Sequence, residues 1–248
     1  MQKLLEEKVA VVTGGCRGIG EAISLKFAEH GAAVVIADVD LSRAPDVLGK
    51  ARAFGAHAEA VRLDIADIMD IRAQCAGIVK RFGKIDVWVN NAGIAENVPL
   101  EELEGEQWDR IMDVDLRGTF FCSQAAYRVM KEQGGGKIIN IASLAGERGG
   151  RFAGAHYSAA KAGVIVLTKC LALSGGEFKI TANAIAPGMI ETQMAADLGF
   201  LKGSHADIPL GRLGTPGDVA DAALYLASGL SDYVTGTTLD INGGVFMR

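Results

Sequence analysis

Apolar and polar positions follow two patterns along this chain. Short, nearly continuous β-branched runs are typical of parallel strands covered on both faces, and the longer amphipathic stretches between them are typical of helices. The predicted strands are Val9–Val12, Ala33–Ala37, Ile85–Val89, Lys137–Ile141, Ile180–Ile185 and Thr237–Ile241. The predicted helices are Ile19–His30, Ile68–Phe82, Gly105–Gln133, Tyr157–Leu173 and Pro216–Ala227. Strand and helix therefore alternate throughout.

This alternation predicts right-handed β-α-β crossovers and an α/β fold. We expect a doubly wound parallel sheet of the Rossmann type, with helices on both faces and a ligand crevice at the carboxyl ends of the strands. A β/α barrel of this length is the structural competitor. The 32 glycines and 5 prolines are spread between the apolar runs, without a linker or repeat, so one domain over residues 1–248 is expected.

A glycine-rich loop, Thr13–Gly20, follows the first predicted strand and favours the doubly wound sheet over the barrel. In that position Gly14, Gly18 and Gly20 allow a tight turn, a close approach to a pyrophosphate and the start of a helix. The loop also contains Arg17 and Ile19. We interpret it as a nucleotide-binding loop.

An acidic residue at the end of the second predicted strand supports this interpretation. Asp38 stands 24 positions after Gly14 (38 − 14), close to the spacing of about 20 residues expected for the acid that binds an adenosine ribose. A carboxylate there accepts the ribose hydroxyls of NAD and repels the 2′-phosphate of NADP, so NAD is favoured. Arg17 in the glycine loop argues for NADP instead, because a guanidinium can bind a 2′-phosphate.

Composition excludes several classes of function. Hydrophobic residues make up 49% of the chain and the formal net charge is −5, which disfavours disorder and a nucleic-acid partner. No apolar run approaches the ~20 residues that are needed to span a bilayer, and the first residues lack the long apolar segment of a signal peptide. A cytoplasmic protein without a membrane segment is therefore expected. The cysteines and histidines are scattered, so no metal site is predicted, and Cys16 in the glycine loop lacks a partner base.

Tyr157 and Lys161 lie four residues apart, which places a phenol and an ammonium on one helix face. Here the chain closely resembles the short-chain dehydrogenase/reductase family, from Lys8 to Gly244. The matching motifs are the glycine loop, Asp38, Asp64 after the third strand, Asn90–Gly93 after the fourth, Ser143 after the fifth, Tyr157 with Lys161, Pro187–Gly188 with Thr192 after the sixth, Gly211–Pro216 and Asn242–Gly244.

The resemblance implies a mechanism. Tyr157 is expected to be the general acid/base that exchanges a proton with the substrate oxygen while a hydride passes to or from the nicotinamide. Lys161 is expected to stabilise the phenolate and to bind the nicotinamide ribose, and Ser143 to donate a hydrogen bond to the substrate oxygen. The other cofactor residues it implies are Asp64, Ile65, Asn91, Ala92, Gly93, Pro187, Gly188, Ile190 and Thr192.

Two departures from the family pattern matter. Asp115 stands where the family usually has an asparagine, whose main-chain carbonyl holds a water that relays a proton from the lysine. Ser143 and Tyr157 are 14 positions apart (157 − 143), one more than is commonest, and the lengthened loop contains Arg148 and Arg151. These arginines either bind an anionic substrate group, for which Arg151 is the better candidate because it follows the glycine pair on the approach to Tyr157, or they face solvent or a subunit interface and pair with acids such as Glu147.

The sequence therefore predicts an NAD-linked dehydrogenase acting on a small secondary alcohol, polyol or hydroxy acid. One alternative is a 3-oxoacyl thioester reductase of fatty-acid synthesis, which normally uses NADP and an acidic carrier protein. Another is a nicotinamide-binding regulatory or scaffold protein that has lost catalysis. The resemblance also implies a homotetramer, assembled through the helix of Tyr157 and the long helix before it.

Overall fold

The computed structural model describes residues 3–150, 153–199 and 207–247. Its centre is a parallel sheet in which seven strands follow the order β3-β2-β1-β4-β5-β6-β7. The strands are β1 (Val9–Thr13), β2 (Ala33–Asp38), β3 (Ala58–Arg62), β4 (Val87–Asn90), β5 (Gly136–Ile141), β6 (Ile180–Pro187) and β7 (Thr238–Ile241). The chain order reverses between β1 and β4, which is the topological switch point where such sheets bind ligands. The predicted doubly wound fold is confirmed.

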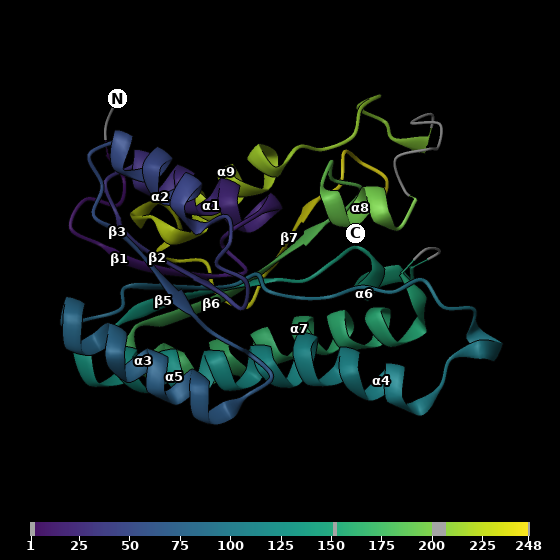
Figure 1. Cartoon of the computed structure of the whole chain (residues 1–248), viewed down its shortest axis with the longest axis horizontal. Helices are drawn as coiled ribbons and strands as arrows, with labels where there is room; N and C mark the ends of the chain where they lie inside the picture. Colours follow the sequence, from purple (N-terminus) through teal and green to yellow (C-terminus); the bar gives the residue numbers. More distant parts are fainter. Residues whose placement is uncertain (1–2, 151–152, 200–206, 248) are drawn as a thin grey trace.

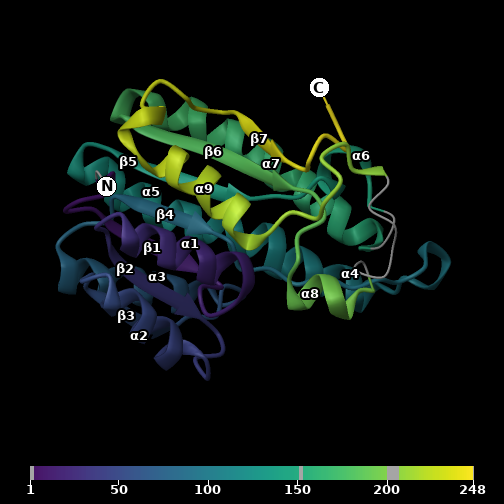
Figure 2. The same cartoon turned by 90° about the horizontal axis from the view of Figure 1, so that it is seen from above.

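Helices cover both faces of the sheet (Figures 1 and 2). The principal helices are α1 (Gly18–Glu29), α2 (Ala44–Ala53), α3 (Ile68–Phe82), α4 (Gly105–Ile111), α5 (Thr119–Gln133), α7 (Gly154–Gly175) and α9 (Pro216–Ala227). Shorter helical segments are η1 (Leu100–Glu102), η2 (Met112–Gly118), α6 (Ala145–Arg148), η3 (Gly176–Phe178), α8 (Gln193–Asp197) and η6 (Gly229–Ser231). In Figure 1, α1, α2 and α9 lie above the sheet, and α3, α5 and α7 lie below it.

The alternation of side chains along the strands explains these two layers. In β1, Ala10 and Val12 face one buried cluster with α1 and α9, whereas Val11 between them faces the opposite cluster with α3 and α5. The central strands are apolar on both sides because both sides are covered, which accounts for the continuous apolar runs in the sequence.

The third strand is absent from the six apolar runs of the sequence. It reads Ala58-Glu59-Ala60-Val61-Arg62, and only its first residue is fully buried. Because β3 lies at the edge of the sheet, it needs less apolar sequence than the central strands.

The predicted helix Gly105–Gln133 is divided in the structure. It consists of α4, the π-helical turn η2 and α5 in succession. Gly118 at the end of η2 packs against the main chain of Ile65, where an added Cβ would lie 2.7 Å from the carbonyl oxygen. π-Helical turns recur at functional sites because they redirect side chains. Here the turn contains Asp115, whose side chain is fully buried.

One helical stretch among the described residues, Gly154–Phe178, is long and apolar enough to cross a membrane by length and composition alone. It contains α7, which has Lys161 and Thr168 buried and packs Val164 and Ile165 against Ala184 of β6 and Ala142, which directly follows β5. These contacts are those of a core helix.

Candidate active site

The glycine loop joins β1 to α1 at the switch point of the sheet. Gly14 and Gly18 have φ values of +63° and +56°, which favour glycine. A Cβ on Gly14 would lie 2.9 Å from the Cα of Ala92, and a Cβ on Gly20 would overlap the carbonyl oxygen of Gly14. Glycine at these two positions therefore lets the loop turn tightly and pack against Ala92, at the start of α1 where dinucleotide-binding folds hold a pyrophosphate.

The segment after β4 holds this loop in place. The main-chain N–H groups of Asn91 and Ala92 donate to Thr13 Oγ1 at 3.0 and 3.1 Å. The Asn91 side chain donates to the carbonyls of Thr13 and Gly14, also at 3.0 and 3.1 Å. Asn91 thus fixes the conformation of the glycine loop. The part taken by Thr13 was not predicted, because a strand-end threonine is unremarkable in sequence.

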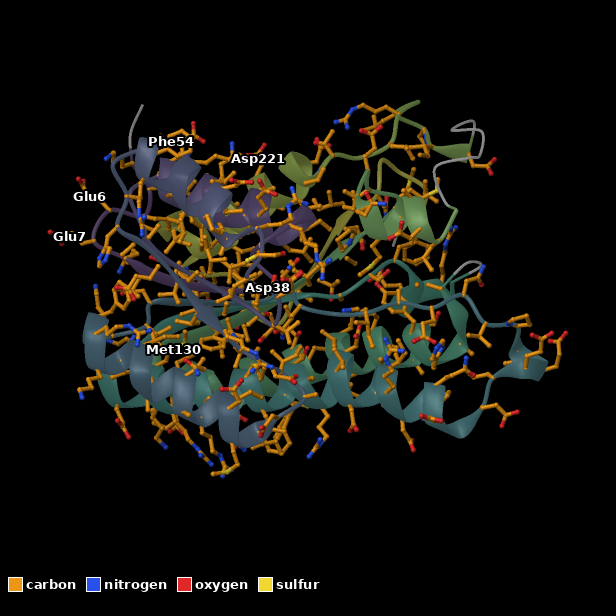
Figure 3. The ribbon with its side chains drawn as sticks, viewed as in Figure 1. Glu6, Glu7, Asp38, Phe54, Met130 and Asp221 are labelled. Atoms are coloured by element: carbon orange, nitrogen blue, oxygen red, sulfur yellow. The ribbon has the colours of Figure 1, made fainter. Side chains whose placement is uncertain are left out.

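Asp38 ends β2 and is 5% exposed. Its Oδ2 accepts from the N–H of Cys16, and its Oδ1 accepts from the N–H of Asp40, both at 3.1 Å. Figure 3 shows it between the two helical layers. Each oxygen keeps a lone pair for a ribose hydroxyl, so the residue fits its predicted task. Arg17 is exposed just before α1.

The thiol of Cys16 lies beside this carboxylate. Burial, together with the charge of Asp38, raises the pKa of Cys16 to about 11. The thiol therefore stays protonated near neutral pH, and the structure offers no support for a nucleophilic role.

Four more of the predicted cofactor residues follow two further strands, β3 and β6. Asp64 follows β3 and its Oδ1 accepts from the N–H of Ala66 at 3.0 Å, while Ile65 beside it is buried. Ile190 is buried after β6, and Thr192 is the N-cap of α8, where its side chain accepts from the N–H of Ala195. A Cβ built on Gly18 would lie 3.6 Å from Thr192 Cγ2, so the glycine loop and the segment after β6 meet across the crevice.

The catalytic candidates meet at the same edge of the sheet. Tyr157 and Lys161 occupy one face of α7, with Nζ 5.5 Å from the centre of the phenol ring. Lys161 is 4% exposed and donates to the carbonyl of Ile141 at the end of β5, at 3.2 Å. Ser143 follows the same strand and is hydrogen-bonded to the phenol of Tyr157. Its Oγ also accepts from the N–H of Ala145 at 3.1 Å, which orients the hydroxyl.

The surroundings of Tyr157 act on its acidity in both directions. Burial raises the pKa of the phenol, the Lys161 ammonium lowers it, the Asp115 carboxylate raises it, and the hydrogen bond with Ser143 lowers it, leaving the pKa above its ordinary value. A cation and a hydroxyl beside a buried phenol are the groups needed to stabilise a phenolate transiently. The arrangement can therefore exchange a proton with a bound oxygen.

Asp115 belongs to this cluster through its side chain. Its Oδ2 lies 3.1 Å from Lys161 Nζ, and its Oδ1 accepts from the N–H of Ile94 at 2.8 Å. Burial raises the pKa of Asp115, while Lys161 and the N–H of Ile94 oppose that rise. Burial acts to lower the pKa of Lys161, but Asp115 and Tyr157 outweigh it and the pKa is raised.

A buried polar network supports the site from beneath. Trp88 Nε1 donates to Asn90 Oδ1 at 2.8 Å, and Asn90 Nδ2 donates to Asn140 Oδ1 at 2.7 Å and to Ser123 Oγ at 2.8 Å. Asn140 Nδ2 donates to Thr168 Oγ1 on α7 at 2.8 Å. The network links β4, β5, α5 and α7, and it was not predicted from the sequence. The feature of the sequence that indicates it is an asparagine near the carboxyl end of each of two apolar strands.

The predicted substrate residues are placed only in part. Arg148 ends α6, directly after the Ser143 turn, and is exposed. It has no ion-pair partner within the described ranges. Arg151 lies outside the described residues. Gly188 follows Pro187 at the end of β6, where the carbonyl of Pro187 accepts from the N–H of Leu144 at 2.9 Å and ties the Ser143 loop to the sheet.

No group of three or more metal-binding side chains comes together in the part of the chain that the structure describes. The donor set at the strand ends instead consists of a glycine main chain, single carboxylates, a phenol and one ammonium. These residues fit a dinucleotide and an alcohol or carbonyl group better than they fit a metal ion.

Comparison with known proteins agrees with this geometry. Residues 14–246 match the family model described as enoyl-(acyl carrier protein) reductase. The chain is 39% identical to 3alpha-hydroxysteroid dehydrogenase of Mediterraneibacter gnavus, with 98% of each chain covered. It is 38% identical to galactitol 2-dehydrogenase of Agrobacterium fabrum (98% of this chain, 99% of the relative). It is also 38% identical to a 3-oxoacyl-(acyl-carrier-protein) reductase of Thermotoga maritima (97% and 98%).

The fold comparison leads to the same group. The crystal structure of a short-chain type dehydrogenase/reductase from Mycobacterium marinum superposes with a TM-score of 0.93 at 34% identity, covering 98% of this chain and 97% of that chain. The family model and the relatives each cover nearly the whole chain. With its glycine loop and its serine, tyrosine and lysine at the carboxyl edge of the sheet, the chain belongs to the short-chain dehydrogenase/reductase family of oxidoreductases.

Proposed function

We propose that the protein is an NAD-linked dehydrogenase that interconverts small secondary alcohols and ketones, with Tyr157 as the general acid/base. The observation that carries the proposal is the meeting of Tyr157, Lys161 and Ser143 at the strand ends beside the glycine loop. Membership of an oxidoreductase family and these three side chains together weigh against a scaffold protein without catalysis.

Each side chain has a task in this proposal. Bound NAD would supply the hydride acceptor for alcohol oxidation. The phenolate of Tyr157 takes the hydroxyl proton of the alcohol, and in the reverse direction the phenol returns it to the carbonyl oxygen. Lys161 stabilises the phenolate by its charge and directs an N–H at the ribose. Ser143 donates to the substrate oxygen and so stabilises charge that develops there.

NAD is proposed over NADP because of Asp38. Its buried carboxylate ends β2 and is fixed by two main-chain N–H groups, so it cannot turn away from a ligand at low cost. A 2′-phosphate at this position would meet a fixed negative charge. Arg17 is exposed and is the group available to a phosphate if that charge is removed.

Two relatives act, by their names, on a steroid hydroxyl and a polyol, which supports a secondary alcohol as substrate. We further propose that Arg148 receives an anionic substituent, because its guanidinium is exposed after the Ser143 turn and has no partner among the described residues. Arg148→Ala should then raise KM for a 3-hydroxy acid several-fold and leave KM for the matching amide unchanged. Equal effects on both would dispose of the anion hypothesis.

A 3-oxoacyl thioester reductase is the second candidate. It is favoured by the description of the family model and by the Thermotoga maritima relative. Asp38 opposes it, since that activity normally depends on NADP. Faster reduction of an acetoacetyl thioester with NADPH than oxidation of any free alcohol with NAD would favour this candidate.

A homotetramer in the cytoplasm completes the proposal. The outer face of α7 carries Val166 and Leu173, which are 58% and 87% exposed, and Phe120 on α5 is 38% exposed beside it. A shallow apolar groove between the two helices is lined by Leu116, Phe120 and Leu167. Such a face is suited to burial against a second subunit.

The test of the proposal is a substrate panel. Secondary alcohols, polyols, hydroxy acids and their ketones are offered with NAD(H) and separately with NADP(H), and the absorbance of the reduced nicotinamide is followed. The proposal predicts turnover of at least one alcohol with NAD at a higher kcat/KM than with NADP. Turnover with NADP alone, or no turnover of any alcohol or ketone, would contradict it.

A further inference from the structure

The side chain of Asp115 forms a contact that an asparagine in its place does not provide. It is fully buried, as is most of Lys161, with 0% and 5% of the two side chains exposed. One carboxylate oxygen lies 3.1 Å from Lys161 Nζ and the other accepts from the N–H of Ile94 at 2.8 Å. An asparagine could keep the bond from Ile94, but its amide group would then turn N–H donors toward the ammonium.

The loop after β4 is shaped around this ion pair. A Cβ on Gly93 would lie 2.9 Å from Asp115 Oδ2 and 3.2 Å from Lys161 Nζ. The absence of a side chain at Gly93 therefore lets the loop approach the pair closely and shields it from water. Shielding strengthens the attraction between the two charges and increases the cost of leaving either one unpaired.

The main-chain carbonyl of Asp115 has a different partner from the side chain. Its carbonyl lies within the π-helical turn η2 and accepts from Thr119 Oγ1 at 2.8 Å. Lys161 Nζ donates to the carbonyl of Ile141 at 3.2 Å and forms an ion pair with the Asp115 carboxylate at 3.1 Å. The contact between η2 and the lysine is thus made by the side chain of residue 115.

We propose that Asp115 is a positioning residue whose carboxylate binds Lys161 directly and opposes the lysine's effect on Tyr157, so that the protein works at higher pH than a version with asparagine at this position. This inference rests on the proposed function, in which Tyr157 exchanges the proton. It assigns the carboxylate itself a part in the pH dependence of the site.

The direction in which the pKa of Tyr157 changes follows from the charged groups around it. Lys161 from the same helix favours the phenolate, and Asp115 from η2 disfavours it. His156, also on α7 and fully buried, is an electrostatic neighbour of Asp115, and in the loop after β4 Glu96 is paired with Arg110 at 2.9 Å. Removing the charge of Asp115 leaves Lys161 unopposed, so the pKa of Tyr157 must fall and base-dependent activity must extend to lower pH.

The direct test is the titration of Tyr157, which needs no substrate. The phenolate absorbance of the wild type is recorded against pH and corrected with the Tyr157→Phe variant, and the measurement is repeated for the Asp115→Asn pair. We expect the Tyr157 midpoint to fall by about one pH unit in Asp115→Asn. Asp113→Asn is the matched control, because Asp113 is an exposed carboxylate on the same turn, paired with Arg117 at 3.4 Å.

Coincident midpoints in the wild type and in Asp115→Asn would overturn the proposal, as would an equal shift in Asp113→Asn. To separate the effect from that of His156, the comparison is repeated in a His156→Gln background, where the shift must persist. The pH profile of kcat/KM for alcohol oxidation should move in the same direction. Failure of the proposed function is distinguishable, since a protein that oxidises no alcohol can still show the shift.

A stability measurement keeps the ion pair testable if Asp115→Asn folds poorly on its own. Lys161→Met leaves the Asp115 carboxylate buried without its cation, so that variant should melt well below the wild type. Adding Asp115→Asn removes the unpaired charge, and the double variant should melt at a higher temperature than Lys161→Met. No recovery in the double variant would contradict the direct pairing.

Discussion

Replacing Asp38 with asparagine tests the origin of cofactor preference. The carboxylate is 5% exposed and anchored by the N–H groups of Cys16 and Asp40, so its charge is fixed at the end of β2. At about 5 Å and an effective dielectric of about 20, one pair of like charges costs about 3 kcal/mol. That corresponds to about a hundredfold change in the ratio of kcat/KM for NADP to kcat/KM for NAD. The phosphate carries more than one charge, which adds to the change, and salt screening reduces it.

The assay is initial-rate kinetics with both cofactors at one ionic strength. Asp38→Asn should raise the NADP to NAD ratio by about two orders of magnitude. It should also lower stability slightly, because one of the two anchoring N–H groups loses its acceptor. Asp40→Asn is the control, since it removes an exposed carboxylate two positions away that accepts from the N–H of Ser42 in the same turn at 2.9 Å. A ratio that is unchanged in Asp38→Asn, or that changes equally in the control, would refute the electrostatic reasoning.

Three further predictions concern other parts of the site and its assembly. Lys161→Met should lower kcat at least ~10²-fold and also raise KM for NAD, because the same ammonium stabilises the phenolate and binds the ribose. A change in kcat alone would show that Lys161 does not bind the ribose. Thr13→Val should lower the free energy of unfolding by about 2–4 kcal/mol in urea titration, since the N–H groups of Asn91 and Ala92 lose their acceptor, whereas Thr13→Ser should cost under about 1 kcal/mol. If the wild type has the mass of the proposed tetramer in light scattering, Leu173→Glu should shift it toward smaller species, and an unchanged mass would exclude this face from the interface.

Much of the fold follows from local sequence because its central strands are buried on both faces. The glycine loop and Asp38 were recognisable since each sits at a strand end with a spacing that dinucleotide binding requires. The edge strand Ala58–Arg62 was implied by the family resemblance but not by the hydrophobic pattern, because a half-exposed strand has no continuous apolar run. The π-helical turn Met112–Gly118 was equally hidden, since the apolar pattern of a helix continues through it, and the close approach of Gly118 to Ile65 joins positions far apart in the sequence.

The same distinction separates the predicted and the missed parts of the site. Tyr157 and Lys161 are four positions apart on one helix, so the local sequence is enough to predict that their side chains are close. The partnership of Asp115 with Lys161 joins η2 to α7, and the tie of Thr13 to Asn91 joins β1 to the end of β4. Such long-range contacts depend on how the layers pack, and sequence spacing does not encode them.

The proposed chemistry depends above all on the proton carried by Tyr157. The decisive measurement compares kcat for alcohol oxidation in the wild type and in Tyr157→Phe, with NAD affinity determined by calorimetry on both proteins. The account predicts a loss of at least ~10²-fold in kcat and an NAD dissociation constant within about a factor of three, because the phenol is removed while the glycine loop and Asp38 are untouched. Wild-type kcat in Tyr157→Phe would contradict it.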